Sequence, residues 1–66
     1  MTHKLIKLKD VLAITGLSRS HIYALAQQER FPKPVKLTER SSAWVESEVQ
    51  EWIDTRIAQR DIGASV

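Results

Sequence analysis

The 66-residue chain contains no cysteine, only two glycines and only two prolines. Without cysteine it has no disulfide framework, no zinc–thiolate cluster and no thiol nucleophile. The two glycines, Gly16 and Gly63, are too far apart to form a glycine-rich loop around a phosphate. No apolar stretch approaches the ~20 residues of a membrane-spanning helix, and residues 1–10 lack the apolar core of a signal peptide. These absences predict a small cytoplasmic domain that folds without covalent cross-links.

The sequence is also poor in patterns of catalytic residues. Catalysis needs a nucleophile beside a base, paired carboxylates in a cleft, or a metal cluster. His3 lies near the N-terminus, and His21 has no acidic neighbour at helical spacing. Glu48, Glu51 and Asp54 fit one solvated helix face. We therefore predict a protein that is not an enzyme and has no catalytic residue, metal site, cofactor or small-molecule substrate.

The charge is distributed unevenly along the chain. Residues 1–40 hold eight basic and three acidic side chains, a net charge of +5, whereas residues 41–66 hold two basic and five acidic, a net charge of −3. A molecule of this kind can turn its first forty residues toward a polyanion and its remainder away. The alternative is a solvated surface whose asymmetry has no function.

The first half of the chain predicts two short helices joined by a tight turn. After an extended segment at residues 4–8, apolar side chains follow helical spacing over residues 9–15. Gly16 suits the left-handed position that ends a helix, and Ser18 suits the N-cap of the next, over residues 18–28. The Phe-Pro-Lys-Pro segment that follows ends this second helix.

The second half predicts a hairpin and a longer helix. Residues 35–45 alternate apolar and polar side chains around a polar turn, which is typical of two half-buried strands. Helical spacing then covers about residues 47–60, with Ile57 on the apolar stripe; Ser47 is a candidate cap, and an alternative start lies a residue or two earlier. Residues 61–66 are expected to fray. Core positions are expected for Phe31, Trp44 and Trp52. The predicted fold is one domain over residues 1–66, mainly α with a small β-hairpin.

Two helices around a tight turn favour a helix-turn-helix, whose second helix enters the DNA major groove. Arg19 can pair with guanine and Gln27 with adenine, while Ser20 and Tyr23 can reach phosphates or base edges. Each residue also has an ordinary interpretation. Arg19 is then a solvated residue of the first turn, and Gln27 an exposed helix residue without a special role. Ser20 then only starts the helix, and Tyr23 packs at the edge of the core. The predicted partner is double-stranded DNA.

The hairpin offers a second contact with DNA. Lys36 and Arg40 lie at or near its tip, and Lys33 lies at its entry. A hairpin in this place can act as a wing that follows the DNA backbone or enters the minor groove. Alternatively, its charges only protect the edge of a solvated sheet.

The ordered motifs of the chain resemble the AlpA family of phage and prophage regulators. The resemblance runs from about Leu5 to Arg60 and is carried by Thr15–Ser20, Ile22–Tyr23, Phe31–Leu37, Trp44–Val49 and Trp52–Ile53. It implies a winged helix-turn-helix, related to MerR-type and excisionase DNA-binding domains. It also implies DNA contacts by Arg19, Ser20, Tyr23 and Gln27 of the recognition helix and by Lys36 and Arg40 of the wing.

The chain departs from the family pattern at three positions. Family members often carry a basic residue where Ala24 stands, and glycines where Arg30 and Thr38 stand.

The hypothesis from the sequence is a sequence-specific transcriptional regulator of phage, prophage or mobile-element type that controls integrase expression or prophage excision. One alternative is an excisionase-like factor that bends DNA. Another is a protein-interaction module, an antirepressor or adaptor, that docks through the acidic face of the last helix. That helix is too short for a long coiled coil, so we expect either that each monomer binds a short half-site or that copies associate weakly on DNA.

Overall fold

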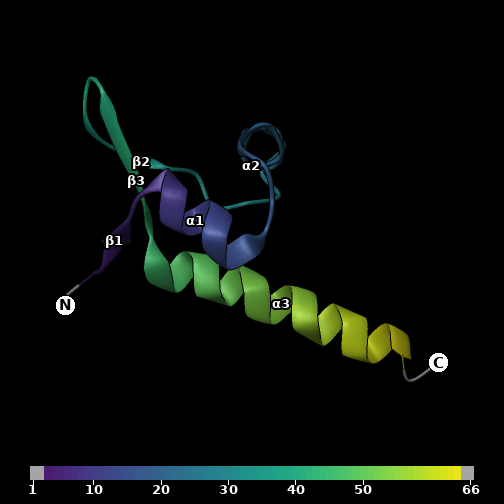
Figure 1. The fold of residues 1–66 in the computed structure, drawn as a ribbon. Coiled ribbons are helices and arrows are strands. Elements are labelled where there is room, and N and C mark those ends of the chain that lie inside the picture. Colours follow the sequence, from purple (N-terminus) through teal and green to yellow (C-terminus); the bar gives the residue numbers. More distant parts are fainter. Residues whose placement is uncertain (1–2, 65–66) are drawn as a thin grey trace.

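The computed structural model describes residues 3–64 and places three helices and three short strands within them (Figure 1). In chain order the elements are β1 (Leu5–Ile6), α1 (Leu8–Thr15), α2 (Arg19–Gln27), β2 (Val35–Thr38), β3 (Ser41–Val45) and α3 (Glu46–Ala64). The chain is therefore mainly α with a small antiparallel hairpin, a winged helix-turn-helix, as the sequence predicts.

The turn between α1 and α2 forms through the local signals seen in the sequence. Gly16 adopts φ 73°, and its N–H donates to the carbonyl of Leu12 at 2.8 Å. Ser18 is the N-cap of α2, and its hydroxyl accepts the N–H of His21 at 3.2 Å. The predicted termination and cap are both confirmed. The helices differ from the predicted ranges by about one residue at their ends, where assignments commonly differ.

The three strands form one antiparallel sheet in the order β1-β3-β2. Ile6 pairs with Trp44, and Val35 pairs with Ala43. The sequence predicts the hairpin, but it does not predict that β1 adds a third strand to it. Helices α1 and α3 both pack against β3, so the central strand ties the N-terminal segment to the C-terminal helix.

One core cluster joins the helices and the sheet. Its buried members are Ile6, Val11, Ile22, Ala26, Phe31, Trp44 and Val49. Half-buried side chains packed against this cluster include Leu25, Trp52 and Ile53. The predicted stripe of α2 is therefore confirmed, and so are the core positions of Phe31 and Trp44. Trp52 covers the core from its edge.

The C-terminus of α2 ends in a Schellman turn. The N–H of Arg30 donates to the carbonyl of Leu25 at 2.8 Å, and the N–H of Glu29 donates to that of Ala26 at 3.1 Å. This pattern requires a left-handed residue after the cap, and Glu29 takes that conformation with φ 60°. The left-handed residue is therefore Glu29, whereas the family often has its glycine one position later, where Arg30 stands. Among the described residues the wing contains no positive φ, so Thr38 stands where the turn needs no left-handed residue.

Replacing Glu29 with glycine is expected to stabilise the fold by about 1 kcal/mol, because glycine adopts the left-handed conformation without steric cost. The ion pair that Glu29 makes with Lys33 at 3.7 Å is exposed and contributes less than that. Urea unfolding followed by circular dichroism measures the change. Gln28→Gly is the matched control, because Gln28 has φ −85° and should lose stability on substitution. A loss of stability in Glu29→Gly would contradict the strain at this position.

The start of α3 follows the earlier of the two predicted starts. The helix begins at Glu46, directly after β3, so Ser47 lies inside the helix and is not its N-cap. The N–H of Glu46 donates to the carbonyl of Lys4 at 2.8 Å. The pairing of β1 with β3 brings this carbonyl to the start of the helix, where it accepts one of the N–H groups of the first turn.

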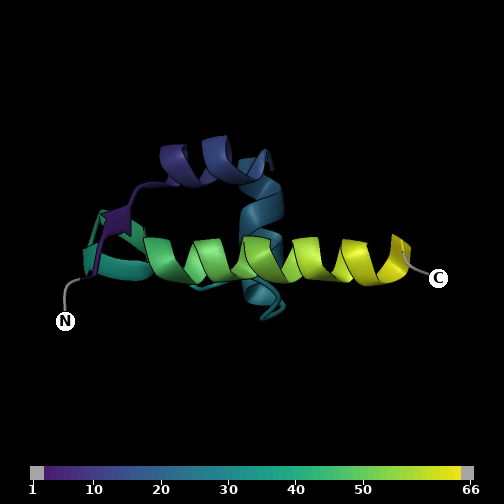
Figure 2. The ribbon, with the colours of Figure 1, turned by 90° about the horizontal axis from the view of Figure 1, so that it is seen from below.

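The end of α3 lies beyond the predicted residue 60. The helix continues to Ala64, so the prediction of a frayed tail is wrong for residues 61–64, while residues 65–66 lie outside the described part. No proline interrupts this stretch, and each residue added to an existing helix gains a hydrogen bond at little cost. Because α3 runs on past the other elements (Figure 2), Ile57 is 43% exposed rather than buried on the apolar stripe. No helix in the described part of the chain is long and apolar enough to cross a membrane.

Candidate nucleic-acid interface

Helix α2 presents one continuous exposed face. Ile22 and Ala26 are buried and Leu25 is half-buried, so these three side chains fix which side of the helix faces the core. At 3.6 residues per turn, the positions opposite this stripe are Ser20, Ala24 and Gln27. All three are exposed. Arg19 and Tyr23 are also exposed, and both lie on the same side of this line, between it and Ala26.

The N-terminus of α2 carries no compensating carboxylate. Its first turn contains no acidic residue, and its cap is the neutral hydroxyl of Ser18. The helix dipole places partial positive charge at this end, and the N–H groups of the first turn attract anions. Arg19 and His21 are both exposed in this turn. The arrangement suits a phosphate or the acceptor atoms of a base edge.

Tyr23 joins the exposed face of α2 to the core. Its ring centroid lies 6.1 Å from that of Trp44 at an interplanar angle of 60°, while 46% of the residue remains exposed. One side of the ring therefore lies at the edge of the core, as one interpretation expects, and the rest faces solvent; the DNA contact of Tyr23 stays a prediction. Tyr23 and Gln27 also line a groove together with Lys33, which precedes β2.

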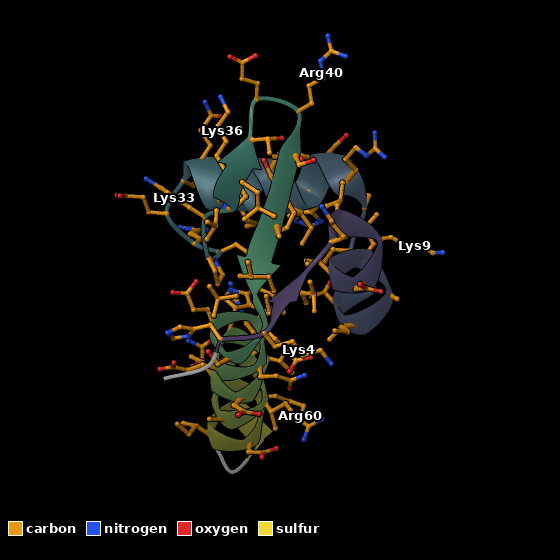
Figure 3. The ribbon with its side chains drawn as sticks, turned by 90° about the vertical axis from the view of Figure 1, so that its left-hand side faces the viewer. Lys4, Lys9, Lys33, Lys36, Arg40 and Arg60 are labelled. Atoms are coloured by element: carbon orange, nitrogen blue, oxygen red, sulfur yellow. The ribbon has the colours of Figure 1, made fainter. Side chains whose placement is uncertain are left out.

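The wing carries its cations away from α3. Figure 3 shows Lys33, Lys36 and Arg40 around the β2–β3 hairpin, with Arg40 at its tip and α3 extending the opposite way. All residues of β2 are exposed. The N–H of Arg40 donates to Thr38 Oγ1 at 3.3 Å, which closes the turn at the tip. Within residues 3–64 the structure shows no ion pair for Arg19, Lys36 or Arg40.

Two tryptophans fix the segment that connects α2 to the wing. Trp44 Nε1 donates to the carbonyl of Pro32 at 3.0 Å, and Trp52 Nε1 donates to the carbonyl of Arg30 at 2.7 Å. Between these two carbonyls, Phe31 is buried and its ring meets that of Trp52 at 4.9 Å. The connection is thus held at three consecutive residues, and this sets the position of the wing relative to α2.

Helix α2 and the wing lie on one side of the molecule, and α3 lies on the other (Figure 1). The acidic side chains of Glu48, Glu51 and Asp54 are exposed on α3. Lys4 and Glu46 form an exposed ion pair at 3.6 Å near the start of this helix. The wing thus carries Lys36 and Arg40 away from α3, while Glu48 and Glu51 line a groove with Lys33 at the base of the wing. We call Arg19, Ser20, Tyr23, Gln27, Lys36 and Arg40, the residues predicted from the sequence, the candidate interface.

Three further residues belong beside the candidate interface on geometric grounds. Ala24 lies at the centre of the exposed face of α2, His21 lies in its first turn, and Lys33 shares a groove with Tyr23 and Gln27. The spacing of Ser20, Ala24 and Gln27 along one helix face is visible in the sequence and could have indicated Ala24. Among the described residues, no group of three or more His, Cys, Asp or Glu side chains is placed to hold a metal ion.

Comparison with known proteins gives two matches. The family model described as prophage CP4-57 regulatory protein (AlpA) matches residues 4–57, from β1 into α3, and so includes α2 and the wing. The uncharacterised protein ORF88 of Enterobacteria phage P4 is 40% identical over 60 residues, which cover 91% of this chain and 68% of ORF88. By both the extent of the family match and the identity to this phage protein, the chain belongs to the AlpA family of prophage regulatory proteins.

Proposed function

We propose that this protein is a sequence-specific transcriptional regulator that binds double-stranded DNA. One observation carries the proposal: helix α2 and the basic wing lie on the same side of the molecule, and α3 extends away from them (Figures 1 and 3). A helix with its side chains is about 10–12 Å wide, and the major groove of B-DNA is about 12 Å wide. The N-terminal half of α2 therefore fits the groove while the wing reaches the adjacent backbone or minor groove.

The side chains of the candidate interface suggest a division of roles. Arg19 and Gln27 have the geometry to read guanine and adenine through paired hydrogen bonds. Ser20 and Tyr23 can donate to phosphates or base edges. Lys36 and Arg40, which form no ion pair within residues 3–64, can contact phosphates. A DNA partner places the protein in the cytoplasm of a bacterial host. Membership in a prophage regulatory family favours a target in a prophage, such as the control of integrase expression or of excision.

A gel-shift titration against fragments of the chain's own genomic neighbourhood tests the proposal, with excess competitor DNA at two salt concentrations. A discrete band that resists competitor is the expected result, and stepwise bands would indicate that several copies associate on DNA. Binding that disappears equally from every fragment as salt rises would reduce the interface to a non-specific basic surface. Absence of binding even at low salt would contradict the proposal and favour protein docking through the acidic face of α3.

Replacing Arg40 with alanine is expected to weaken binding to all fragments and to lower the slope of log K against log salt by about one. The reason is that one fewer counterion is released when one phosphate contact is lost. Arg60→Ala is the matched control, because Arg60 is an exposed arginine on α3, away from the wing (Figure 3). Equal slopes for the wild type and Arg40→Ala would remove Arg40 from the phosphate contacts.

A further inference from the structure

The wing contains one irregular position, and a leucine occupies it. Across the β2–β3 ladder, Lys36 pairs with Ser42 and Thr38 pairs with Ser41. Leu37 lies between them without a partner on β3, so it is the extra residue of a β-bulge. Bulges redirect a side chain away from the regular alternation of the strand, and they are frequent beside functional sites.

The side chain of Leu37 is largely open to solvent. The residue is 45% exposed, and it is absent from the described side chains that pack against the core cluster. Val35, two residues earlier on the same strand, is 40% exposed but lines a groove with Trp52 and Val45 at the base of the wing. The two aliphatic residues are about equally exposed but lie in different places: Val35 lies at the base of the wing, and Leu37 lies near its tip.

Cations surround Leu37 on the wing. Lys36 precedes it, Arg40 lies at the tip, and both are exposed without an ion pair in the described part of the chain. Glu39 is the single acidic residue of the hairpin, against the three basic residues labelled in Figure 3 at this end. A single exposed leucine is ordinary on a protein surface. An exposed leucine at a bulge, between cations that can hold phosphates, has the composition of the apolar wedges that enter the minor groove.

We propose that Leu37 is a wedge that inserts at a base step in the minor groove and bends the DNA. The inference rests on the proposed function, since it requires that the wing meets DNA. The bulge directs the leucine out of the ladder, while Lys36 and Arg40 bind the phosphates on either side of the groove. Pyrimidine–purine steps unstack most easily, so the preferred point of insertion is a TA or CA step.

The experiment measures binding and bending separately with the full chain. The probes are short duplexes labelled at both ends for energy transfer, one cut from a genomic fragment of the titration above and one with a single central TA step. The wild type is expected to raise energy transfer, as a bend in the range of about 20–90° would do. Leu37→Ala should abolish most of this rise, with an affinity loss of about tenfold or less because most phosphate contacts remain. Val35→Ala should bend DNA as the wild type does, and Leu37→Met should restore the bend.

The outcomes separate the wedge from the proposed function. If the wild type binds without bending, or if Leu37→Ala bends DNA fully, the wedge is wrong while DNA binding stands. If the wild type binds no duplex, the proposed function itself fails. Sedimentation of the free protein tests the alternative that Leu37 contacts a second copy of the chain. If the wild type self-associates while Leu37→Ala is monomeric, edge strand β2 pairs with a second copy and the wedge is wrong. Thermal melts confirm that each variant is folded.

Discussion

Replacing Trp44 with alanine is expected to leave most of the protein unfolded at room temperature. The residue is 1% exposed, it is the largest fully buried side chain, and its strand lies between β1 and β2. Removing a buried tryptophan costs about 3–5 kcal/mol. A domain below about 70–80 residues rarely gains more than about 3–5 kcal/mol from its core. The loss is therefore about as large as the whole stability of the fold.

Circular dichroism during heating measures this effect, and a milder variant shows its origin. Trp44→Phe keeps most of the ring but removes the N–H that donates to Pro32, so a loss of about 1–3 kcal/mol is expected. Tyr23→Ala is the control for the ring contact, because Tyr23 touches Trp44 while half of the residue is exposed. It should cost far less than Trp44→Ala. A cooperative melt of Trp44→Ala at the wild-type temperature would contradict the central place given to this side chain.

Trp44 also shows which part of the fold could be predicted from the sequence. Its burial, like that of Phe31, follows from bulk and apolar character. The turn between α1 and α2 could be predicted for a different reason: Gly16 and Ser18 act on neighbouring residues, through a left-handed φ and a hydroxyl that accepts a nearby N–H. Signals that act within one helical turn are visible in a linear sequence.

The features that the sequence did not predict depend on residues far apart in the chain. The N–H of Glu46, at the start of α3, donates to the carbonyl of Lys4, which lies there because β1 pairs with β3. The hydrogen bonds of the two indoles connect residues 12 and 22 positions apart. A tryptophan N–H needs a partner when it is buried, but no local pattern indicates which carbonyl accepts it.

In the candidate interface, too, some features could be predicted from the sequence and others depend on the folded chain. Helical periodicity alone identifies the exposed side of α2, because Ile22 and Ala26 mark the buried side. The hairpin could be predicted from alternation, but the bulge at Leu37 could not, because it depends on how Ser41 and Ser42 register against β2. The orientation of α2 relative to the wing depends on the fixed segment around Phe31, which exists only in the folded chain. The roles of the individual residues toward DNA stay predictions.

Replacing Ala24 with glutamate is expected to reduce DNA affinity by about a hundredfold or more while leaving the fold intact. Ala24 lies at the centre of the exposed face of α2, between Ser20 and Gln27, where the helix would approach the bases most closely. A carboxylate there meets the negative potential of the groove, and a like-charge contact of this kind costs several kcal/mol. The residue is exposed and glutamate is a good helix former, so stability should change by no more than about 0.5 kcal/mol.

The matched control for this prediction is Ala58→Glu. Ala58 is an exposed alanine of α3, so the same substitution changes the net charge equally but on a helix outside the candidate interface. Gel-shift titration of both variants at one salt concentration, with thermal melts alongside, separates the effect of the position of the added charge from the effect of the net charge. If both variants lose affinity equally, only the net charge of the molecule matters. If Ala24→Glu binds like the wild type, α2 does not enter the groove. Loss of binding by a folded Ala24→Glu alone would show that DNA is read by the face of α2 opposite Ile22 and Ala26.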